Sequence, residues 1–242
     1  RLLNRTTRKV ELTDVGKIYF ESCKRIVDEA RSAHEQLAML HTTPTGVLRA
    51  SLPADFSSVF LAPIISKFSE IYPDLKFEFD ITPRQADLIA ENFDLAIRMG
   101  YLPDSNLIAH KLLTLNGQLY ASPKYLEKFG CPTHPDDLKN HECLNFPKNE
   151  YWILQKGTES HRIKTNSKFV MNNMAMMKRL ALLNQGIIFT HPQVVFEELK
   201  NHTLTPIIPD WIGESLPVFI LTESRLLPAK TKLFIDFLKE NI

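Results

Sequence analysis

The stretch between residues 47 and 99 alternates between strand-like and helix-like patterns, and this order limits the possible folds more than any other feature of the chain. Apolar strand patterns lie at Val47–Leu52, Leu75–Ile81 and Phe93–Met99, and helical patterns lie at Ser57–Tyr72 and Gln85–Asn92. A helix between two strands carries the chain back to the same end of the sheet, so the strands run parallel. We therefore expect an α/β fold with helices on both faces of a parallel sheet.

The second half of the chain repeats this alternation with shorter elements. Strands are expected at Gly117–Ser122, Cys143–Phe146, Tyr151–Gln155, His161–Lys164, Lys168–Met171, Gly186–Thr190 and Leu216–Thr222. Helices are expected at Pro123–Phe129, Asn173–Asn184, Pro192–Lys200 and Pro228–Leu238. The two halves together predict two α/β units within one chain of 242 residues.

A long amphipathic helix is expected before the first unit. Thr13 is a favourable N-cap residue, and no proline interrupts residues 14–43. Apolar side chains recur at alternating spacings of four and three, which is typical of a coiled-coil seam. The positions predicted to dimerise are Tyr19, Ile26, Ala30, Ala33, Leu37 and Leu40. The alternative is a helix that packs on its own domain, and Pro44 and Gly46 end the helix in either case.

Composition and charge exclude several classes of protein. The net charge is +1, so any contact with nucleic acid has to come from a local patch. No apolar run approaches the ~20 residues that span a membrane, and the N-terminus has no apolar signal core. The three cysteines, Cys23, Cys131 and Cys143, form no CxxC pair and are interpreted as ordinary buried or half-buried thiols. These features predict a cytoplasmic protein without a disulfide framework.

No motif of an enzyme or of a bound cofactor is found in the sequence. The GxSxG, HExxH, P-loop and GxGxxG patterns are all missing. Histidines without the spacing of metal ligands stand at His110, His134, His141, His161, His191 and His202. We therefore expect no catalytic residue, no metal and no cofactor.

A series of short motifs follows the order found in one family of bacterial regulators. The motifs are Arg1–Gly16, Gly46–Arg49, Leu61–Pro63, Tyr72–Asp74, Phe93–Gly100, Asp104–Ile108, Ala121–Leu126, His134–Leu138 and His141–Leu144. Each is weak alone, but together they extend over nearly the whole chain. The sequence therefore resembles the LysR-type transcriptional regulators.

The resemblance implies a domain organisation. Its three segments are a winged helix-turn-helix remnant at 1–12, a linker and dimerisation helix at 13–43, and an effector-binding domain at 44–242. That domain is expected to have the two lobes of a periplasmic binding protein: lobe one at 46–116 plus 223–242, lobe two at 123–214, and crossovers near 117–122 and 215–222. The family's recognition helix is expected to precede residue 1, so this chain alone is not expected to bind DNA with sequence specificity.

Basic residues at the start of the chain are expected to contact double-stranded DNA in the complete regulator. Arg5 and Arg8 flank Thr6 and Thr7 on what the resemblance implies is a wing hairpin. Guanidinium groups are permanently charged and suit phosphates and narrow minor grooves, and threonine hydroxyls reach phosphate oxygens. The alternative is a basic terminus that is merely solvated.

The effector cleft is expected beyond the carboxyl ends of the strands, where ligands bind in open parallel sheets. The predicted effector-binding residues are Ala54, Asp55, Ser57, Ser58, Met99, Gly100, Asn145, Phe146, Asn172, Asn173, Thr190 and His191. Asp55 either caps its own helix or favours a ligand with an amine or hydroxyl group. Asn173 fits a helix cap as well as a ligand contact, and His191 either contacts the ligand or only ends a strand. Arg98 is expected to form a structural ion pair.

The resulting hypothesis is a transcriptional regulator that binds a small-molecule effector between its lobes. It is expected to act as a homodimer or homotetramer, with RNA polymerase as a further partner and no membrane. Two alternatives share the fold: a solute-binding protein of a transporter, and an enzyme on the same bilobal scaffold. The first would carry a signal peptide and no basic wing, and the second would need a cofactor-binding cysteine and an arginine-lined cleft.

Overall fold

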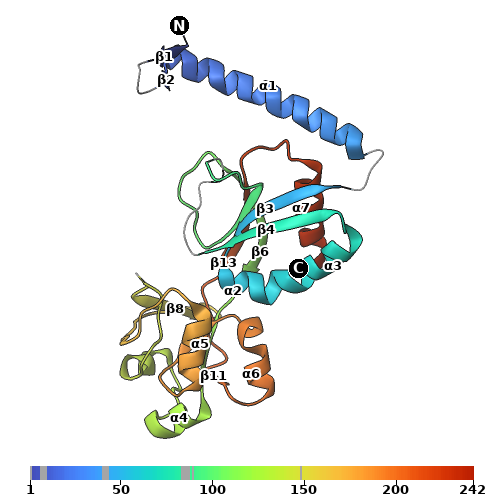
Figure 1. Cartoon of the computed structure of the whole chain (residues 1–242). Helices are drawn as coiled ribbons and strands as arrows, with labels where there is room; N and C mark the ends of the chain where they lie inside the picture. Colours follow the sequence, from blue (N-terminus) through green and yellow to red (C-terminus); the bar gives the residue numbers. More distant parts are fainter. Residues whose placement is uncertain (1, 6–9, 40–43, 83–87, 89, 148) are drawn as a thin grey trace.

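The computed structural model describes residues 2–5, 10–39, 44–82, 88, 90–147 and 149–242. Figure 1 shows a long helix above two stacked lobes, with a small N-terminal hairpin at one end of the helix. Among the described residues, no helix combines the length and the apolar character needed to cross a membrane.

The N-terminal part consists of a hairpin and a helix: β1 (Leu3–Arg5), β2 (Val10–Leu12) and α1 (Asp14–Met39). The backbone N–H of Gly16 donates to Thr13 Oγ1 at 2.9 Å, so the predicted N-cap is confirmed. The Thr13 N–H donates to the Leu2 carbonyl at 3.0 Å and thereby holds the hairpin against the helix. A side chain at Gly16 would place its Cβ 1.9 Å from that carbonyl oxygen, so this junction requires glycine.

A five-stranded sheet forms the centre of lobe one, in the order β4 (Leu75–Ile81), β3 (Gly46–Leu52), β5 (Leu95–Met99), β13 (Leu216–Thr222), β6 (Ile108–Leu115). Strand β3 runs parallel to β4 and β5, so the predicted parallel arrangement is confirmed for these three strands. Strand β13 runs antiparallel to β5 and β6, which makes the sheet mixed. The sequence pattern misses β6, because exposed Lys111 and Thr114 interrupt its apolar residues.

The helical segment after β3 begins earlier than its pattern predicts. Helix α2 (Ala54–Phe56), the π-helical turn η1 (Ser57–Leu61) and helix α3 (Ala62–Ile71) follow one another without a break. Pro63 has no N–H to donate into the preceding turn, and the wide π-helical turn lies directly before it. The helix expected at 85–92 falls largely outside the described residues.

Aromatic side chains fill the core of lobe one. Phe68 is fully buried, and its ring lies 4.7–6.2 Å from the rings of Tyr72, Phe77, Phe234 and Phe237. The last two belong to the C-terminal helix α7 (Ala229–Asn241), which therefore packs against α3. This packing places the C-terminal helix in lobe one although all of lobe two precedes it in the sequence.

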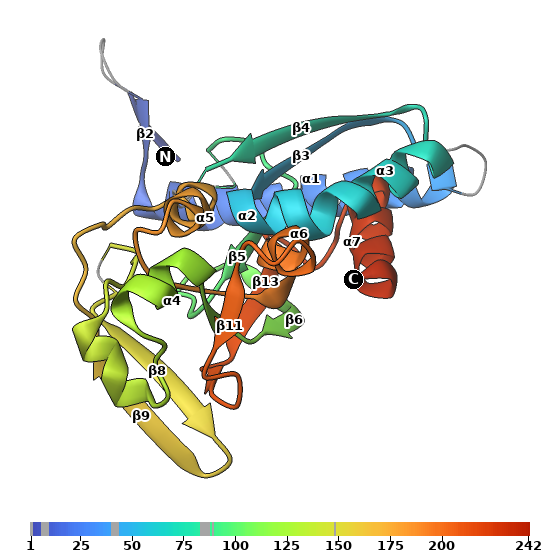
Figure 2. The same ribbon diagram turned by 90° about the horizontal axis from the view of Figure 1, so that it is seen from below.

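Two three-stranded antiparallel sheets form lobe two. Their orders are β10 (Ile188–Thr190), β7 (Gln118–Ala121), β11 (Thr205–Ile207) and β12 (Ile212–Gly213), β8 (Tyr151–Lys156), β9 (Glu159–Lys164). The helices of this lobe are α4 (Pro123–Phe129), η2 (Pro135–Asn140), α5 (Met174–Leu182), η3 (Pro192–Val195) and α6 (Phe196–Lys200). Figure 2 shows β8 and β9 as a hairpin that projects from the rest of the lobe. The short β11 and β12 contain Pro206 and Gly213 and give no strand pattern in the sequence.

The prediction of regular strands is wrong for two segments of lobe two. The segments 143–146 and 168–171 contribute only isolated bridges, Cys143 with Ile187 and Asn145 with Val170. Pro147 follows directly and has no N–H, so the ladder of hydrogen bonds cannot be extended there.

Two short connections join the lobes: β6 leads into β7, and β12 leads into β13. The connections bond to one another, because the Gly213 N–H donates to the Gly117 carbonyl at 2.8 Å. Ser215 Oγ also donates to Asn116 Oδ1 at 3.0 Å. Most of the segment 215–222, expected as a crossover, is strand β13 in the sheet of lobe one, whereas β7 lies in lobe two.

Candidate effector-binding cavity

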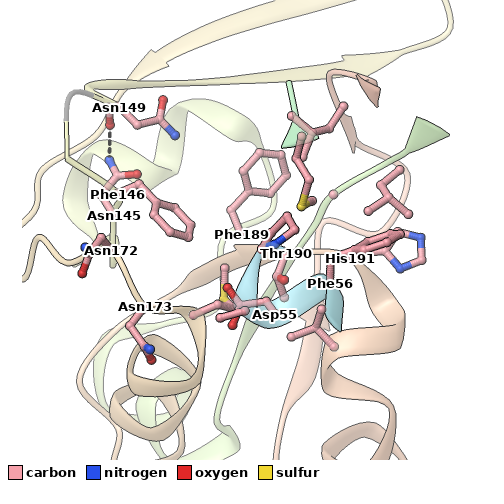
Figure 3. Close-up of a pocket in the computed structure, with 18 of the residues that line it drawn as sticks. Asp55, Phe56, Asn145, Phe146, Asn149, Asn172, Asn173, Phe189, Thr190 and His191 are labelled. Atoms are coloured by element: carbon pink, nitrogen blue, oxygen red, sulfur yellow. Dashed lines mark hydrogen bonds between the residues drawn. The ribbon is translucent and has the colours of Figure 1, made fainter. Parts of the chain in front are cut away.

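A cavity of about 640 Å³ lies between the two lobes. This volume is in the range occupied by small organic ligands. Most of the predicted effector-binding residues line it, namely Ala54, Asp55, Met99, Asn145, Phe146, Asn172, Asn173, Thr190 and His191. Figure 3 shows that the labelled side chains come from several separate segments of the chain.

The ends of strands place much of this wall. Asp55 lies just after β3, Met99 is the last residue of β5, and His191 directly follows β10. Residues at strand ends face the opening of an α/β unit, where side chains are free to meet a ligand. The interlobe position of the cavity thus follows from the strand order.

Ser57, Ser58 and Gly100 were predicted to bind the effector, but they do not line the described wall of the cavity. Ser57 Oγ donates to the Pro53 carbonyl at 2.7 Å, and Ser58 Oγ donates to the Asp55 carbonyl at 3.1 Å. Both hydroxyls therefore turn back onto their own helical segment, which starts at Ala54 and not at Ser57 as expected. Gly100 is held by a hydrogen bond from its N–H to the Pro217 carbonyl at 2.8 Å.

Asp55 connects the two lobes. Its carboxylate accepts backbone hydrogen bonds from Met174 and Ala175, at the N-terminus of α5, and Lys178 lies near enough to attract it. The α2 segment has no side-chain cap, so the expectation that Asp55 caps its own helix is wrong. Asp55 of lobe one instead supplies negative charge to a helix N-terminus of lobe two, where unpaired N–H groups favour an anion (Figure 3).

Burial raises the pKa of the Asp55 carboxyl, and this effect outweighs the hydrogen bonds from α5 and the attraction of Lys178. Because the folded-state pKa is raised, the group's contribution to stability is present at low pH and is lost as the pH rises through that pKa. We expect Asp55→Asn to be more stable than the wild type near neutral pH, with a difference that shrinks as the pH falls toward about 4. Denaturant unfolding at several pH values measures this difference.

Asp137 offers a matched control of opposite sign. Hydrogen bonds from the Thr133 and His134 backbones lower its pKa, so its contribution to stability is lost as the pH falls. Asp137→Asn should therefore be destabilised near neutral pH and should approach the wild type in acid. Parallel pH profiles for the two variants would contradict the described environment of Asp55.

Two asparagines of the wall have structural partners. Asn173 Oδ1 accepts from the Met176 N–H at 2.8 Å, so its predicted role as a helix cap is confirmed. Asn145 accepts from Trp152 Nε1 at 3.0 Å and donates to Thr165 Oγ1 at 2.6 Å. These bonds hold Trp152 in the cavity wall.

Aromatic side chains that the sequence did not single out form much of the wall. Phe56 and Phe60 stack with centroids 5.0 Å apart, and Phe60 meets the His191 ring at 5.5 Å. Across the cavity Trp152 and Phe189 lie 5.4 Å apart. An apolar residue on a helix or strand fits a core position equally well, so the sequence holds no separate signal for these residues.

Polar side chains of the wall include Thr82 and Arg98. Thr82 Oγ1 is buried in this wall and has no hydrogen-bond partner within the described part of the chain, so it can serve a bound ligand. Arg98 Nη2 donates to Ser51 Oγ at 2.8 Å, and Nη1 donates to the Ser51 carbonyl at 3.0 Å. These hydrogen bonds give Arg98 a structural role in the sheet, and the ion pair expected for it stays a prediction.

His191 presents a neutral imidazole to the cavity. Burial lowers its pKa, and its Nδ1 accepts from the Gln193 N–H at 3.2 Å. Accepting at Nδ1 leaves the proton on Nε2, which makes this side chain a hydrogen-bond donor at neutral pH.

The described residues among those predicted to dimerise or to bind DNA do not line the cavity. Tyr19, Ile26, Ala30 and Ala33 are exposed on α1, whereas the side chain of Leu37 and all of Leu40 lie outside the described residues. The backbone of Arg5 is part of β1, and Thr6, Thr7 and Arg8 lie outside the described residues.

The three cysteines differ in their surroundings. Cys143 is buried, and burial raises the pKa of its thiol to about 12, so it is inert near neutral pH. Cys23 is half-buried, in agreement with the sequence interpretation. Cys131 is exposed, and the interpretation of a buried or half-buried thiol is wrong for it, because the chain after Gly130 runs along the surface.

Comparison with known proteins gives a consistent result. A family profile described as the LysR substrate binding domain matches residues 41–242. An HTH-type transcriptional regulator of Xanthomonas campestris is 33% identical over 246 residues, which cover 98% of this chain and 72% of that protein. The HTH-type transcriptional activator AaeR of Escherichia coli is 32% identical over 244 residues, which cover 99% of this chain and 79% of that protein.

Solved structures share the fold along the chain. The full-length structure of the Vibrio cholerae virulence activator AphB, a member of the LTTR family, has a TM-score of 0.74 at 27% identity and covers 100% of this chain and 84% of its own. CrgA, a LysR-type transcriptional regulator from Neisseria meningitidis, has a TM-score of 0.74 at 29% identity and covers 99% of this chain and 83% of its own.

These relatives are transcriptional regulators and not enzymes, so the main hypothesis is supported over a solute-binding protein or an enzyme on the same scaffold. The profile match covers both lobes and therefore the cavity between them. The chain belongs to the LysR-type transcriptional regulators, which bind DNA and respond to small-molecule effectors.

Proposed function

We propose that the interlobe cavity binds a small aromatic effector that carries an amine or hydroxyl group. The proposal rests on the composition of the wall, in which aromatic rings from both lobes lie beside polar groups. The proposed contacts are Ala54, Asp55, Met99, Asn145, Phe146, Asn172, Asn173, Thr190 and His191, together with Thr82. Rings prefer offset or edge contacts with other rings, so an aromatic ligand gains from this wall beyond its buried area.

The charge of Asp55 supports an effector without a carboxylate at this position. The N-terminus of α5 is the place where an anionic ligand would gain most, and Asp55 already occupies it. A second carboxylate there would repel the first, whereas an ammonium or hydroxyl group could donate to it. The effector is therefore expected to bind beside Asp55 and not to replace it.

A matched series of benzylamine, benzyl alcohol and benzoate tests this proposal by thermal shift. These probes share the ring and differ in charge, and we expect benzylamine and benzyl alcohol to raise the Tm more than benzoate. A probe present at 100 times its Kd stabilises the fold by about 2.7 kcal/mol. For a chain of this size that is a rise in Tm of roughly 5–10 °C.

The variant Asp55→Asn is expected to reverse the order, with benzoate gaining over benzylamine. Asp137→Asn, which removes a carboxylate outside the cavity, should leave the order unchanged. An order that stays the same in Asp55→Asn would sink the assignment of Asp55, and a flat response to all three probes would sink the aromatic class.

Effector binding is proposed to change the angle between the lobes, with lobe one formed by 46–116, β13 and 223–242, and lobe two formed by β7 and 123–214. Residues 1–12 are proposed to belong to the DNA-binding wing and 13–43 to the linker helix. The cavity has walls from both lobes, so a ligand that contacts both favours the closed arrangement over an open one. The change in angle is proposed to alter contact with RNA polymerase, and the protein is proposed to act in the cytoplasm.

DNA contact is proposed for Arg5, Thr6, Thr7 and Arg8. The support is the pairing of β1 with β2 as a hairpin. The sequence that connects the two strands contains Thr6, Thr7 and Arg8 and is positively charged. In a regulator with its complete DNA-binding domain, Arg8→Ala should weaken operator binding and reduce the salt slope by about 1. Equal affinities of variant and wild type across a salt series would contradict the contact.

A homodimer through α1, with a tetramer as the larger assembly, is proposed from the surface of that helix. Tyr19 is 56% exposed and Ile26 is 68% exposed, which leaves large apolar side chains in contact with water in the single chain. Pairing of two such helices buries these side chains and matches the two-fold symmetry of palindromic DNA sites.

A further inference from the structure

Three side chains able to bind a metal ion lie together on lobe two, outside the cavity. His134 and Asp136 stand at the start of η2, and His161 stands on β9. One ligand atom from each lies within 4.8 Å of the other two. His134 Nδ1 is 3.6 Å from Asp136 Oδ2, and the two imidazole centroids are 4.9 Å apart. The expectation of histidines scattered without ligand geometry therefore does not hold for this pair.

The backbone that carries two of these ligands is firmly held. Asp137 Oδ2 accepts from the N–H groups of Thr133 and His134, both at 2.9 Å. The His134 ring in turn accepts from the Asp136 N–H at 3.2 Å, which completes a capping box at the start of η2. Bringing the three ligand atoms to metal-binding distances therefore needs side-chain rotation and little backbone movement.

A buried tryptophan lies against both histidines. Trp211 is only 5% exposed, and its ring meets His134 edge-on at 5.7 Å and His161 edge-on at 5.0 Å. The indole therefore packs against one side of the cluster. It also places a fluorescent group directly beside the cluster.

Lys139 would compete with a metal ion for the Asp136 carboxylate, and this lysine is weakly held. Lys139 Nζ lies 3.0 Å from Asp136 Oδ1, but its side chain is 62% exposed. Exposed ion pairs of this kind contribute between nothing and about 1 kcal/mol, so a divalent cation can displace the lysine from the carboxylate.

We propose that His134, Asp136 and His161 form a binding site for a divalent transition-metal ion such as Zn²⁺. Two imidazole nitrogens and one carboxylate oxygen are a donor set that Zn²⁺, Co²⁺, Ni²⁺ and Cu²⁺ accept, whereas Mg²⁺ and Ca²⁺ prefer oxygen ligands alone. Three protein ligands leave a coordination position for water. The site joins η2 to β9 and is separate from the effector cavity, because none of its three residues lines that cavity.

Titration of the tag-free chain with Zn²⁺ by calorimetry, and with Cu²⁺ by tryptophan fluorescence, tests the site. We expect one Zn²⁺ per chain and quenching of Trp211 by Cu²⁺. His161→Gln and Asp136→Asn should each weaken binding at least tenfold. His110→Gln, which removes a histidine of lobe one on β6, should bind like the wild type.

Asp136→Asn changes an exposed side chain, so it keeps the test decisive if His161→Gln does not fold. Circular dichroism establishes which variants are folded. Equal Zn²⁺ affinity in folded Asp136→Asn and wild type would overturn the proposal, as would the loss of binding in His110→Gln. The absence of any heat or quenching at neutral pH would overturn it as well.

Discussion

Replacing Ile26 with glutamate is expected to convert the proposed dimer of this chain into monomers. Ile26 is 68% exposed on α1 and lies on the predicted seam. Loss of a large buried aliphatic side chain costs about 2–5 kcal/mol, and each 1.4 kcal/mol changes a dissociation constant tenfold. Each dimer would lose two such side chains, so we expect the dissociation constant to rise at least ~100-fold. Sedimentation velocity over a range of concentrations measures this.

Val27 provides the matched control for this experiment. It is 64% exposed on the same helix and about 100° further around it, off the predicted seam. Val27→Glu introduces the same charge and should leave the dimer largely intact. Equal dissociation in the two variants would show that a different face of α1 pairs, and a monomeric wild type would remove the dimer proposal altogether.

Gly213→Ala is expected to change the shape of the effector cavity and to abolish most ligand binding. A Cβ at position 213 would lie 2.0 Å from Cζ of Phe189 and 2.5 Å from its Cε2. The Phe189 ring lines the cavity and packs on Trp152 at 5.4 Å, so its displacement alters the wall that a ligand meets. Overpacking of this kind costs about 1–3 kcal/mol, and we expect binding of the preferred benzylic probe to weaken at least tenfold.

A second substitution separates this steric effect from general damage. Phe189→Ala removes the ring that the new methyl group would strike. In the double variant, Gly213→Ala should cost little of the free energy of unfolding. A double-mutant cycle of unfolding free energies should then give a coupling energy of about 1–2 kcal/mol. Additive costs would falsify the clash as the cause and point instead to the backbone of β12.

Most of lobe one could be predicted because its signals are local. Val47–Leu52 and Leu75–Ile81 have patterns complete within a few residues, and the structure places β3 and β4 there to within one residue. Strand β6 was missed because exposed residues interrupt its apolar pattern, and its pairing partner, β13, is distant in the sequence. The isolated bridges of lobe two were mistaken for strands because an apolar run does not tell how many partners it will find.

The residues of the candidate site could also be predicted only where local signals place them. Asp55, Thr190 and His191 could be placed on the cavity because strand order alone puts strand ends at the cleft. The role of Asp55 at the N-terminus of α5 could not, because it depends on how the lobes close. Ser57 and Ser58 were misplaced because the helix starts at Ala54 and turns their hydroxyls onto its own carbonyls.

The paired connections between the lobes have a mechanical consequence. The bond from the Gly213 N–H to the Gly117 carbonyl fixes the two crossing segments side by side at one edge of the cavity. Two adjacent fixed points leave two rigid bodies essentially one axis of rotation and resist both twisting and sliding. We therefore expect chemically different effectors to report to the DNA-binding part through a single variable, the opening angle about that axis. An agonist and an antagonist would then differ in the angle at which they hold the lobes and not in the direction of the motion.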